Sequence, residues 1–275
     1  MRVSHADLRI ARRGGLTIRF ATMGPVIYLI GELSDGGSSG TLLETPCTSP
    51  HWALLLRGEI EVERDGLGPV RVDAGQAFHV PAGDPPHRFR AAGRLAALGF
   101  APLEPTGIDE GDIDRAGFEI IDELGETSVD PETSRINIAS VAGPVALKRG
   151  QIEAEASIMG PWVFSLARFG SVSGYAASWC DLPHWGTVIH GTIAIEWEDD
   201  VEIIGAGEAF YCPAGPPGHR IEVTDSATVA DYTPLDAIIR PGRTADWRPR
   251  LAIAVSEGPA AVEAPAPVVV VGLDR

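Results

Sequence analysis

Two sets of cysteine and histidine residues recur along the chain with nearly the same spacing. In each set a cysteine precedes a first histidine by four residues, and a second histidine follows: Cys47, His51 and His87, then Cys180, His184 and His219. A thiolate and two imidazoles form a borderline-to-soft ligand set, so we expect a divalent transition metal at one or both sets. Zinc is the plainest choice, since three protein ligands leave a fourth position for water or substrate, and iron or copper also fit.

The surroundings of these residues are repeated as well. The segment that begins Cys47-Thr-Ser-Pro-His51-Trp52 returns as Cys180-Asp-Leu-Pro-His184-Trp185. A glycine- and proline-rich block from Gly75 to Arg88 returns from Gly207 to Arg220. An internal repeat of this length predicts two copies of one domain. We therefore expect an N-terminal domain over 1–104, a connecting segment over 105–147, a C-terminal domain over 148–256 and an Ala/Pro-rich tail over 257–275.

Each copy has the pattern of short β-strands. Apolar and β-branched residues run for three to eight positions between glycines and prolines, without a long helical period. In the first copy the expected strands are 26–33, 40–45, 51–56, 59–63, 70–72, 77–80, 87–90 and 95–100. Such strands predict a sandwich, jelly roll or barrel. Tight hairpin turns are expected at Gly58 and Gly191.

Segments outside the copies give weaker signals. Residues 118–124 favour a strand or a short helix, and parts of 1–11 and of the linker can cross onto the other domain. Residues 268–271 favour a last edge strand or a simple tail.

The second block of each copy resembles the second motif of the cupin superfamily. That motif reads Gly-x5-Pro-x-Gly-x2-His, and here one extra residue precedes His87 and His219. Two copies resemble a bicupin. The resemblance implies an all-β chain with two tandem double-stranded β-helix barrels, jelly rolls of the cupin type.

The first cupin motif departs from the family pattern. His51 and His184 stand in the slot of the family's glutamate, and the two cysteines stand in the slot of its second histidine. Thr45 and Ser178 fill the remaining histidine slot. The family's three-His-one-Glu metal set thus becomes Cys, His and His. Glu44, or His79 if it points inward, is an extra candidate ligand.

Two readings without a metal stay open. In one, the cysteines and histidines form a hydrogen-bonded interior. In the other, Cys47 with its histidines is a nucleophilic pair, for which the sequence shows no orienting Asn or Asp.

The resemblance implies an enzyme that acts on a small organic molecule in the barrel, such as an isomerase, cyclase, lyase or dioxygenase. No catalytic residue can be assigned and no organic-cofactor motif is seen. One fold hosts many chemistries, so a non-catalytic sensor of a metabolite or metal, and a metal-free structural bicupin, are alternatives.

The composition of the chain limits the classes of partner that we expect. The 275 residues are 44% hydrophobic and carry a formal charge of −16. Such a charge disfavours nucleic acid and anionic membranes. Three cysteines make a poor disulfide framework, and the first residues lack the apolar run of a signal peptide, so we expect a cytoplasmic protein. An exposed edge strand also suggests a homodimer.

Overall fold

The chain divides into two compact units. The computed structural model describes residues 2–3, 8–34, 46–66, 68–83, 85–91, 93–103, 119–121, 145–149, 152–170, 175–176, 179–239 and 268–270. The N-terminal unit comprises His5–Ser140 with Val268–Arg275. The C-terminal unit comprises Val141–Pro267 with Met1–Ser4.

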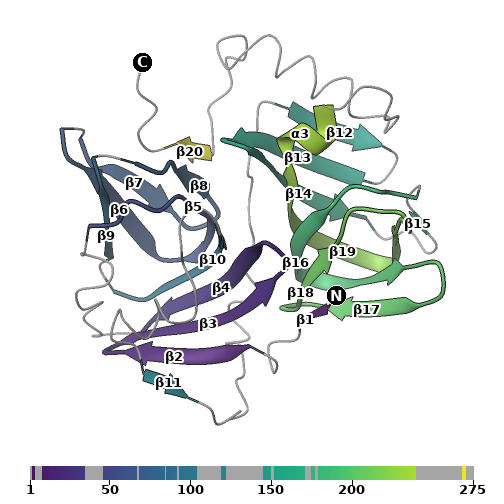
Figure 1. Cartoon of the computed structure of the whole chain (residues 1–275), viewed down its shortest axis with the longest axis horizontal. Helices are drawn as coiled ribbons and strands as arrows, with labels where there is room; N and C mark the ends of the chain where they lie inside the picture. The colour runs from purple at the N-terminus through teal and green to yellow at the C-terminus, as the bar shows by residue number, and fades with distance from the viewer. Residues whose placement is uncertain are drawn as a thin grey trace. The chain divides into compact units, whose positions relative to one another are not determined.

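The N-terminal unit is built from two sheets (Figure 1). An eight-stranded sheet has the order β11-β2-β3-β4-β10-β5-β8-β20, and a three-stranded sheet has the order β7-β6-β9. The strands are β2 (Arg9–Arg13), β3 (Leu16–Met23), β4 (Val26–Leu33), β5 (His51–Arg57), β6 (Glu59–Arg64), β7 (Val70–Asp73), β8 (Ala77–Val80), β9 (His87–Ala91), β10 (Leu95–Pro102), β11 (Glu119–Ile121) and β20 (Val268–Val270).

The C-terminal unit forms a nine-stranded sheet with the path β1-β18-β16-β19-β14-β13-β12, while β15 pairs with β19 and β17 with β16. Its elements are β1 (Arg2–Val3), β12 (Val145–Arg149), β13 (Ile152–Met159), β14 (Trp162–Phe169), β15 (Tyr175–Ala176), β16 (His184–Glu196), β17 (Val201–Gly205), β18 (Ala209–Cys212), β19 (Arg220–Pro234) and helix α3 (Leu235–Ile239). Within the described part of the chain, no helix is long and apolar enough to cross a membrane.

The predicted strands of the first copy agree with the structure wherever it describes them. Each of β4 to β10 covers its predicted segment, and the segment 118–124 contains the short strand β11. The predicted strand at 40–45 lies outside the described residues. Glycines and prolines end these strands because they interrupt the hydrogen-bond pairing between strands. Their positions in the sequence therefore predicted the strand ends.

The expected hairpin turns at Gly58 and Gly191 are wrong. Gly58 joins β5 to β6, which lie in different sheets, and Gly191 lies within the continuous strand β16 at an irregularity of its pairing with β19. Both glycines have a positive φ, of 81° and 77°. A Cβ would collide with the backbone oxygen of Arg94 at Gly58 and of Ser226 at Gly191. Each glycine therefore lets the strand bend where another strand passes close to it.

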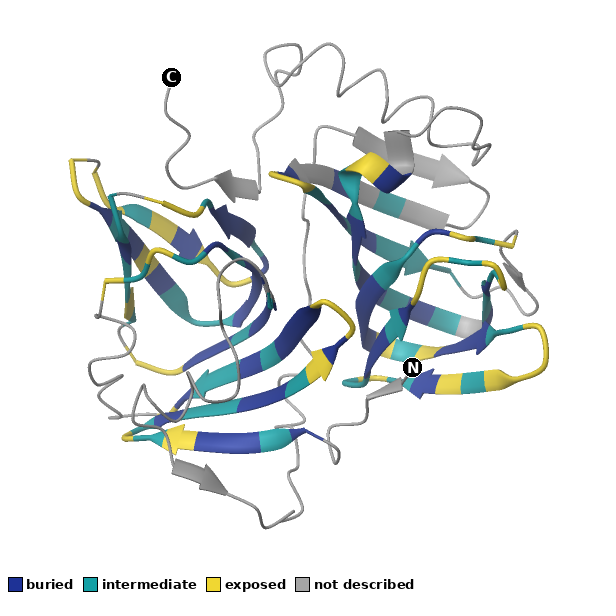
Figure 2. Ribbon diagram, in the orientation of Figure 1, coloured by how far each residue is buried: buried dark blue, intermediate teal, exposed yellow. Residues whose placement is uncertain are grey.

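Strand alternation decides which residues face the interior of each unit. In β5, Ala53 and Leu55 belong to the apolar core, and β16 contributes Val188 and Ile193 to the core of its unit. Side chains two positions apart share a face of a strand, so His51 lies on the same face as Ala53. Figure 2 shows the largely buried course of β5 and β16.

The ends of the chain complete the sheets of the two units. β1 pairs antiparallel with β18, and β20 pairs in parallel with β8. The segment 268–271, for which an edge strand was one of two expectations, does form such a strand over Val268–Val270. Part of the segment 1–11 likewise joins the unit of the second copy.

Candidate metal centre

A short backbone bridge brings each cysteine beside the second histidine of its set. The amide and carbonyl groups of Cys47 exchange hydrogen bonds with those of His87, with N···O distances of 2.8 and 2.9 Å. Cys180 and His219 do the same at 2.7 and 2.8 Å. The bridges are antiparallel and are isolated from the strand pairs of the sheets. They hold together residues that lie 40 or so positions apart in the sequence, which the spacing alone did not show.

The first histidine of each set opens a long interior strand. His51 is the first residue of β5 and His184 is the first residue of β16. The four-residue spacing from the cysteine spans the turn that leads into the strand. In both units the histidine Nε2 lies 3.3 Å from the cysteine Sγ.

The N-terminal centre consists of Cys47, His51 and His87. One ligand atom from each residue lies within 4.8 Å of the other two. The two imidazole rings meet edge to face, with centroids 5.0 Å apart. Both ring nitrogens of His87 are buried, and neither has a hydrogen-bond partner among the residues that the structure describes.

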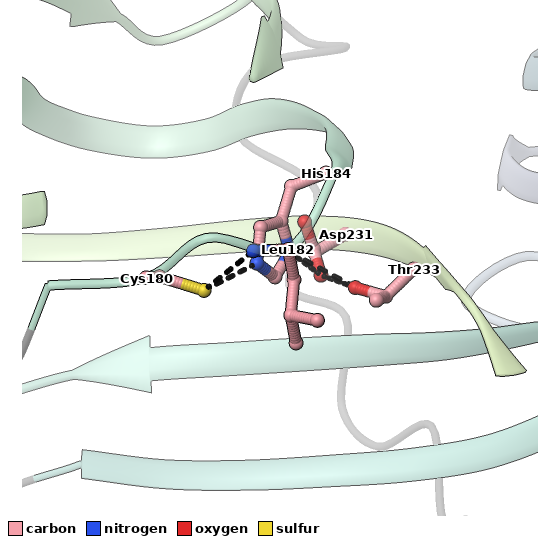
Figure 3. Close-up of polar contacts among 5 residues, drawn as sticks. All are labelled: Cys180, Leu182, His184, Asp231 and Thr233. Atoms are coloured by element: carbon pink, nitrogen blue, oxygen red, sulfur yellow. Dashed lines mark hydrogen bonds and ion pairs between the residues drawn. The ribbon is translucent and has the colours of Figure 1, made fainter. Parts of the chain in front are cut away.

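The C-terminal centre consists of Cys180, His184 and His219. Its three ligand atoms also lie within 4.8 Å of one another, and its rings lie 5.3 Å apart at 86°. The backbone amide of Leu182 donates to the Cys180 Sγ at 3.5 Å. Figure 3 shows that the His184 ring has Cys180 on one side and Asp231 with Thr233 on the other.

The donor set of each centre fits a tetrahedral metal. Zinc binds sulfur at about 2.3 Å and imidazole nitrogen at about 2.0–2.1 Å, which places neighbouring ligand atoms about 3.5 Å apart. The observed separation of 3.3 Å between sulfur and Nε2 is close to this value. A buried imidazole without a hydrogen-bond partner is costly, and a metal bond to His87 would satisfy it.

Of the other sequence candidates, His79 does not join these sets. His79 stacks on Trp52, with ring centroids 4.9 Å apart, and it pairs with Trp52 across β5 and β8. The two side chains therefore lie on the face of the sheet opposite His51. The Tyr211 ring stacks on Trp185 in the same way in the C-terminal unit. Glu44 lies outside the described residues.

The sequence reasoning missed Asp231 and Thr233. The Asp231 Oδ2 lies 3.1 Å from the His184 Nδ1, and the Thr233 Oγ1 lies 2.9 Å from the same nitrogen. The signal that was present is their position in the repeat, because two polar residues interrupt an apolar strand where the first copy has Gly99 and Ala101.

The pKa values of the histidines differ between the two centres. Burial, and then the neighbouring His87 and His79, lower the pKa of His51 to about 3. Burial, and then the Arg64 guanidinium, lower the pKa of His87 to about 4. The imidazoles of the N-terminal centre are therefore neutral at pH 7 in the absence of metal.

In the C-terminal centre a carboxylate reverses this balance. Burial opposes the charge on His184, but the Asp231 carboxylate and the Cys180 sulfur outweigh it and raise the pKa of His184 to about 10. Burial likewise opposes the thiolate, yet hydrogen bonds from His184 and His219 lower the pKa of Cys180 to about 5. Without metal, the pair is a thiolate beside an imidazolium.

Comparison with solved structures identifies the fold. AerE from Microcystis aeruginosa superposes with a TM-score of 0.54 at 9% identity, covering 83% of this chain and 98% of AerE. Oxalate decarboxylase superposes with a TM-score of 0.58 at 14% identity, covering 85% of this chain and 77% of the enzyme. A structure of the Bacillus subtilis oxalate decarboxylase, from work on its Mn(II) centres, gives 0.57 at 12% identity with the same coverage.

At such low identity the likeness concerns the fold alone. It confirms the predicted class, an all-β chain with two cupin barrels in tandem. No protein-family model and no curated protein sequence matches the chain.

Proposed function

We propose that the chain is a bicupin that binds a divalent transition metal, zinc first among the candidates, through Cys47, His51 and His87 and through Cys180, His184 and His219. One observation carries this proposal. Two separate units each gather one sulfur and two imidazoles to within 4.8 Å. The cysteine of each trio stands four residues before the first histidine, and a backbone bridge brings the second histidine beside the cysteine.

The choice of metal follows from the sulfur ligand. The oxalate decarboxylase structure that resembles this fold was studied for its Mn(II) centres. Oxygen ligands suit manganese, whereas a thiolate favours zinc or copper(I). The cysteine in each trio thus supports zinc over manganese, and iron or copper remain chemically compatible with the imidazoles.

We further propose that the metal acts on a small organic molecule held in the barrel. Three protein ligands leave a coordination position for water or a substrate oxygen, which a bound metal would polarise. An isomerase, cyclase, lyase or dioxygenase reaction is compatible with such a site. In a sensor or structural site, a fourth protein ligand would instead occupy that position. If added azide leaves the visible spectrum of the cobalt-loaded protein unchanged, that result would favour a sensor or structural role.

The remaining proposals concern partners and location. The formal charge of −16 supports a protein that avoids nucleic acid and anionic membranes. A homodimer and a cytoplasmic location stay proposals that gel filtration and fractionation of the native source would test.

Metal analysis tests the proposal. Protein purified without added metal is expected to carry metal at both centres, and His51→Ala and His184→Ala should each remove the metal of one centre. His190→Ala is the matched control, because this exposed histidine of β16 belongs to neither trio. Unchanged metal content in both His51→Ala and His184→Ala, or wild-type protein that takes up no zinc, would contradict the proposal.

A second candidate function rests on Asp231. Cys180, His184 and Asp231 form a hydrogen-bonded row of the kind that activates a cysteine nucleophile, in which the third group orients the imidazole. This orienting group was missing from the sequence reading. Alkylation by iodoacetamide separates the two candidates. A nucleophile would react at Cys180 in the protein as purified, whereas a metal ligand would react only after the metal is removed.

A further inference from the structure

The hydrogen-bonded row in the C-terminal centre continues beyond the proposed ligands. The Thr233 hydroxyl donates to the Asp231 Oδ2 at 3.1 Å, and this same oxygen lies 3.1 Å from the His184 Nδ1 (Figure 3). The Asp231 Oδ2 therefore contacts both the Thr233 hydroxyl and the imidazole, and the Thr233 Oγ1 also lies 2.9 Å from the His184 Nδ1. Asp231 itself lies outside the group of ligand atoms.

This row determines which ring nitrogen of His184 faces the metal position. A ring that donates its Nδ1–H to a carboxylate presents Nε2 on its opposite side, and that Nε2 lies 3.3 Å from the Cys180 Sγ. Histidines that bind metals commonly donate their other N–H to a carboxylate, which fixes the ring and raises its basicity. The side chains of His184 and Asp231 are only 13% and 16% exposed, so water screens their interaction weakly.

The residue that pairs with Asp231 has no side chain. Asp231 on β19 pairs with Gly186 on β16, two residues after His184 and on the same face. A side chain at Gly186 would collide with the Phe210 ring and would lie 2.9 Å from the Ala230 oxygen. The missing side chain at Gly186 therefore makes room for the Phe210 ring.

The N-terminal centre has the same ligands without this support. Gly99 and Ala101 stand where the second copy has Asp231 and Thr233. Gly99 pairs with Leu29, while Asp231 pairs with Ser165. A Cβ at Gly99 would lie 2.9 Å from the Leu29 Cδ1, so the apolar side chain occupies the space that a carboxylate would need.

We infer that Asp231, held by Thr233, is a positioning residue that orients His184 and makes the C-terminal centre the tighter of the two metal sites. The inference rests on the proposed function, since it assumes that both trios bind metal. Loss of such a carboxylate typically weakens metal binding about 10–100-fold. We expect a loss of this size at the C-terminal centre alone.

The test reads each centre separately in the full chain. Cys47→Ser with His51→Ala leaves only the C-terminal centre, and Cys180→Ser with His184→Ala leaves only the N-terminal centre. Asp231→Ala and Asp231→Asn are placed in each background, and zinc affinity is measured by competition with a chromophoric chelator. Cobalt(II) bound at the C-terminal centre supplies a second signal through its thiolate charge-transfer and ligand-field bands.

The expected result is about 10–100-fold weaker zinc binding and altered cobalt bands for Asp231→Ala in the C-terminal background, with no change in the N-terminal background. Asp231→Asn has the size of the native side chain and carries the test if Asp231→Ala unfolds the metal-free protein. Unchanged affinity and spectrum in Asp231→Asn and in every folded Asp231→Ala sample would overturn the inference while leaving the metal proposal intact. Absence of zinc binding in both parent backgrounds would overturn the metal proposal itself.

Discussion

The two candidate centres have matching trios of one cysteine and two histidines but different surroundings. In the C-terminal centre a carboxylate and a hydroxyl support His184. In the N-terminal centre the equivalent positions are Gly99 and Ala101, and the charged neighbour is instead the buried Arg64, which pairs with His87 across β6 and β9. Trp197 takes the place of Arg64 in the second copy, with its ring 5.5 Å from that of His219.

This difference shows how a duplicated fold can keep a ligand set and change its chemistry. The cysteine, the two histidines and the backbone bridge are common to both copies. Burial is the main cause that keeps the first histidine of the N-terminal centre, His51, neutral, whereas the Asp231 carboxylate outweighs burial at His184. An anionic neighbour favours the imidazolium and a cationic one favours the neutral ring.

Acidification should expose the difference most strongly, in protein freed of metal. Burial is the main cause that lowers the pKa of His51 to about 3 and the pKa values of His79 and His87 to about 4. Neighbouring charges lower the pKa of His51 and of His87 further. The unfolded chain, with ordinary histidines near 6.5, then binds more protons below that pH. The contribution of these histidines to the stability of the N-terminal unit is fully present above pH 6.5 and is lost as the pH falls toward 4. At pH 5 the loss is about 2 kcal/mol for each of these imidazoles.

The C-terminal unit should respond differently. The raised pKa of His184, about 10, contributes stability that is lost as the pH rises through that value. The lowered pKa of Cys180, about 5, contributes stability that is lost as the pH falls toward 5. The two effects offset each other between the ordinary values of the two groups. Alkaline loss above about pH 9 is therefore expected in this unit.

Urea unfolding at pH 5, 7 and 9.5, with proteolytic fragments mapped to each unit, measures both effects. Equal acid sensitivity in the two units, or an N-terminal unit that is as stable at pH 5 as at pH 7, would show that these imidazoles are not buried in their neutral form.

Transferring the carboxylate should make the two centres alike. The triple variant Leu29→Ser, Gly99→Asp and Ala101→Thr gives the N-terminal centre the three residues found at 165, 231 and 233. In the background without C-terminal ligands, zinc affinity is expected to rise about 10-fold or more. Gly99→Asp alone should gain less, because Leu29 fills the space beside it. Equal zinc affinities for the triple variant and its parent would show that the carboxylate is not the cause of the difference between the two centres.

Removal of the hydroxyl should have the smallest effect. Thr233→Val keeps the shape of the side chain but loses the hydrogen bond to the Asp231 Oδ2 and the contact with the His184 Nδ1. A single hydrogen bond is worth about 1 kcal/mol, so zinc affinity at the C-terminal centre should fall about fivefold. Ala101→Val in the N-terminal background is the control and should leave zinc affinity unchanged. A loss as large as that of Asp231→Ala would mean that the contact of the Thr233 hydroxyl with the His184 Nδ1 supports the imidazole as strongly as Asp231 does.

Much of this site could be predicted from the sequence because duplication marked it. The six ligand candidates stood at matched positions in two copies, and glycines and prolines outlined the strands that carry them. The wrong hairpin turns at Gly58 and Gly191 have a tertiary cause. Both glycines do take a positive φ, but the reason is a neighbouring strand that passes close to them, which local sequence does not reveal.

The repeat marked Asp231 and Thr233 only as positions where the copies differ, and such a difference does not reveal that they contact His184. Asp231 lies 47 residues from His184 and reaches it through the pairing of β19 with β16. The pairing of the terminal strands could not be predicted for the same reason, since nothing local in Arg2–Val3 or Val268–Val270 identifies β18 or β8 as a partner.

X-ray absorption at the zinc edge tests the central claim most directly. Zinc-loaded protein with both centres occupied should show one sulfur at about 2.3 Å and two imidazole nitrogens at about 2.0–2.1 Å per zinc. The sulfur signal should fall by half in Cys47→Ser and in Cys180→Ser at equal zinc content. A zinc environment of nitrogen and oxygen without sulfur would contradict the account.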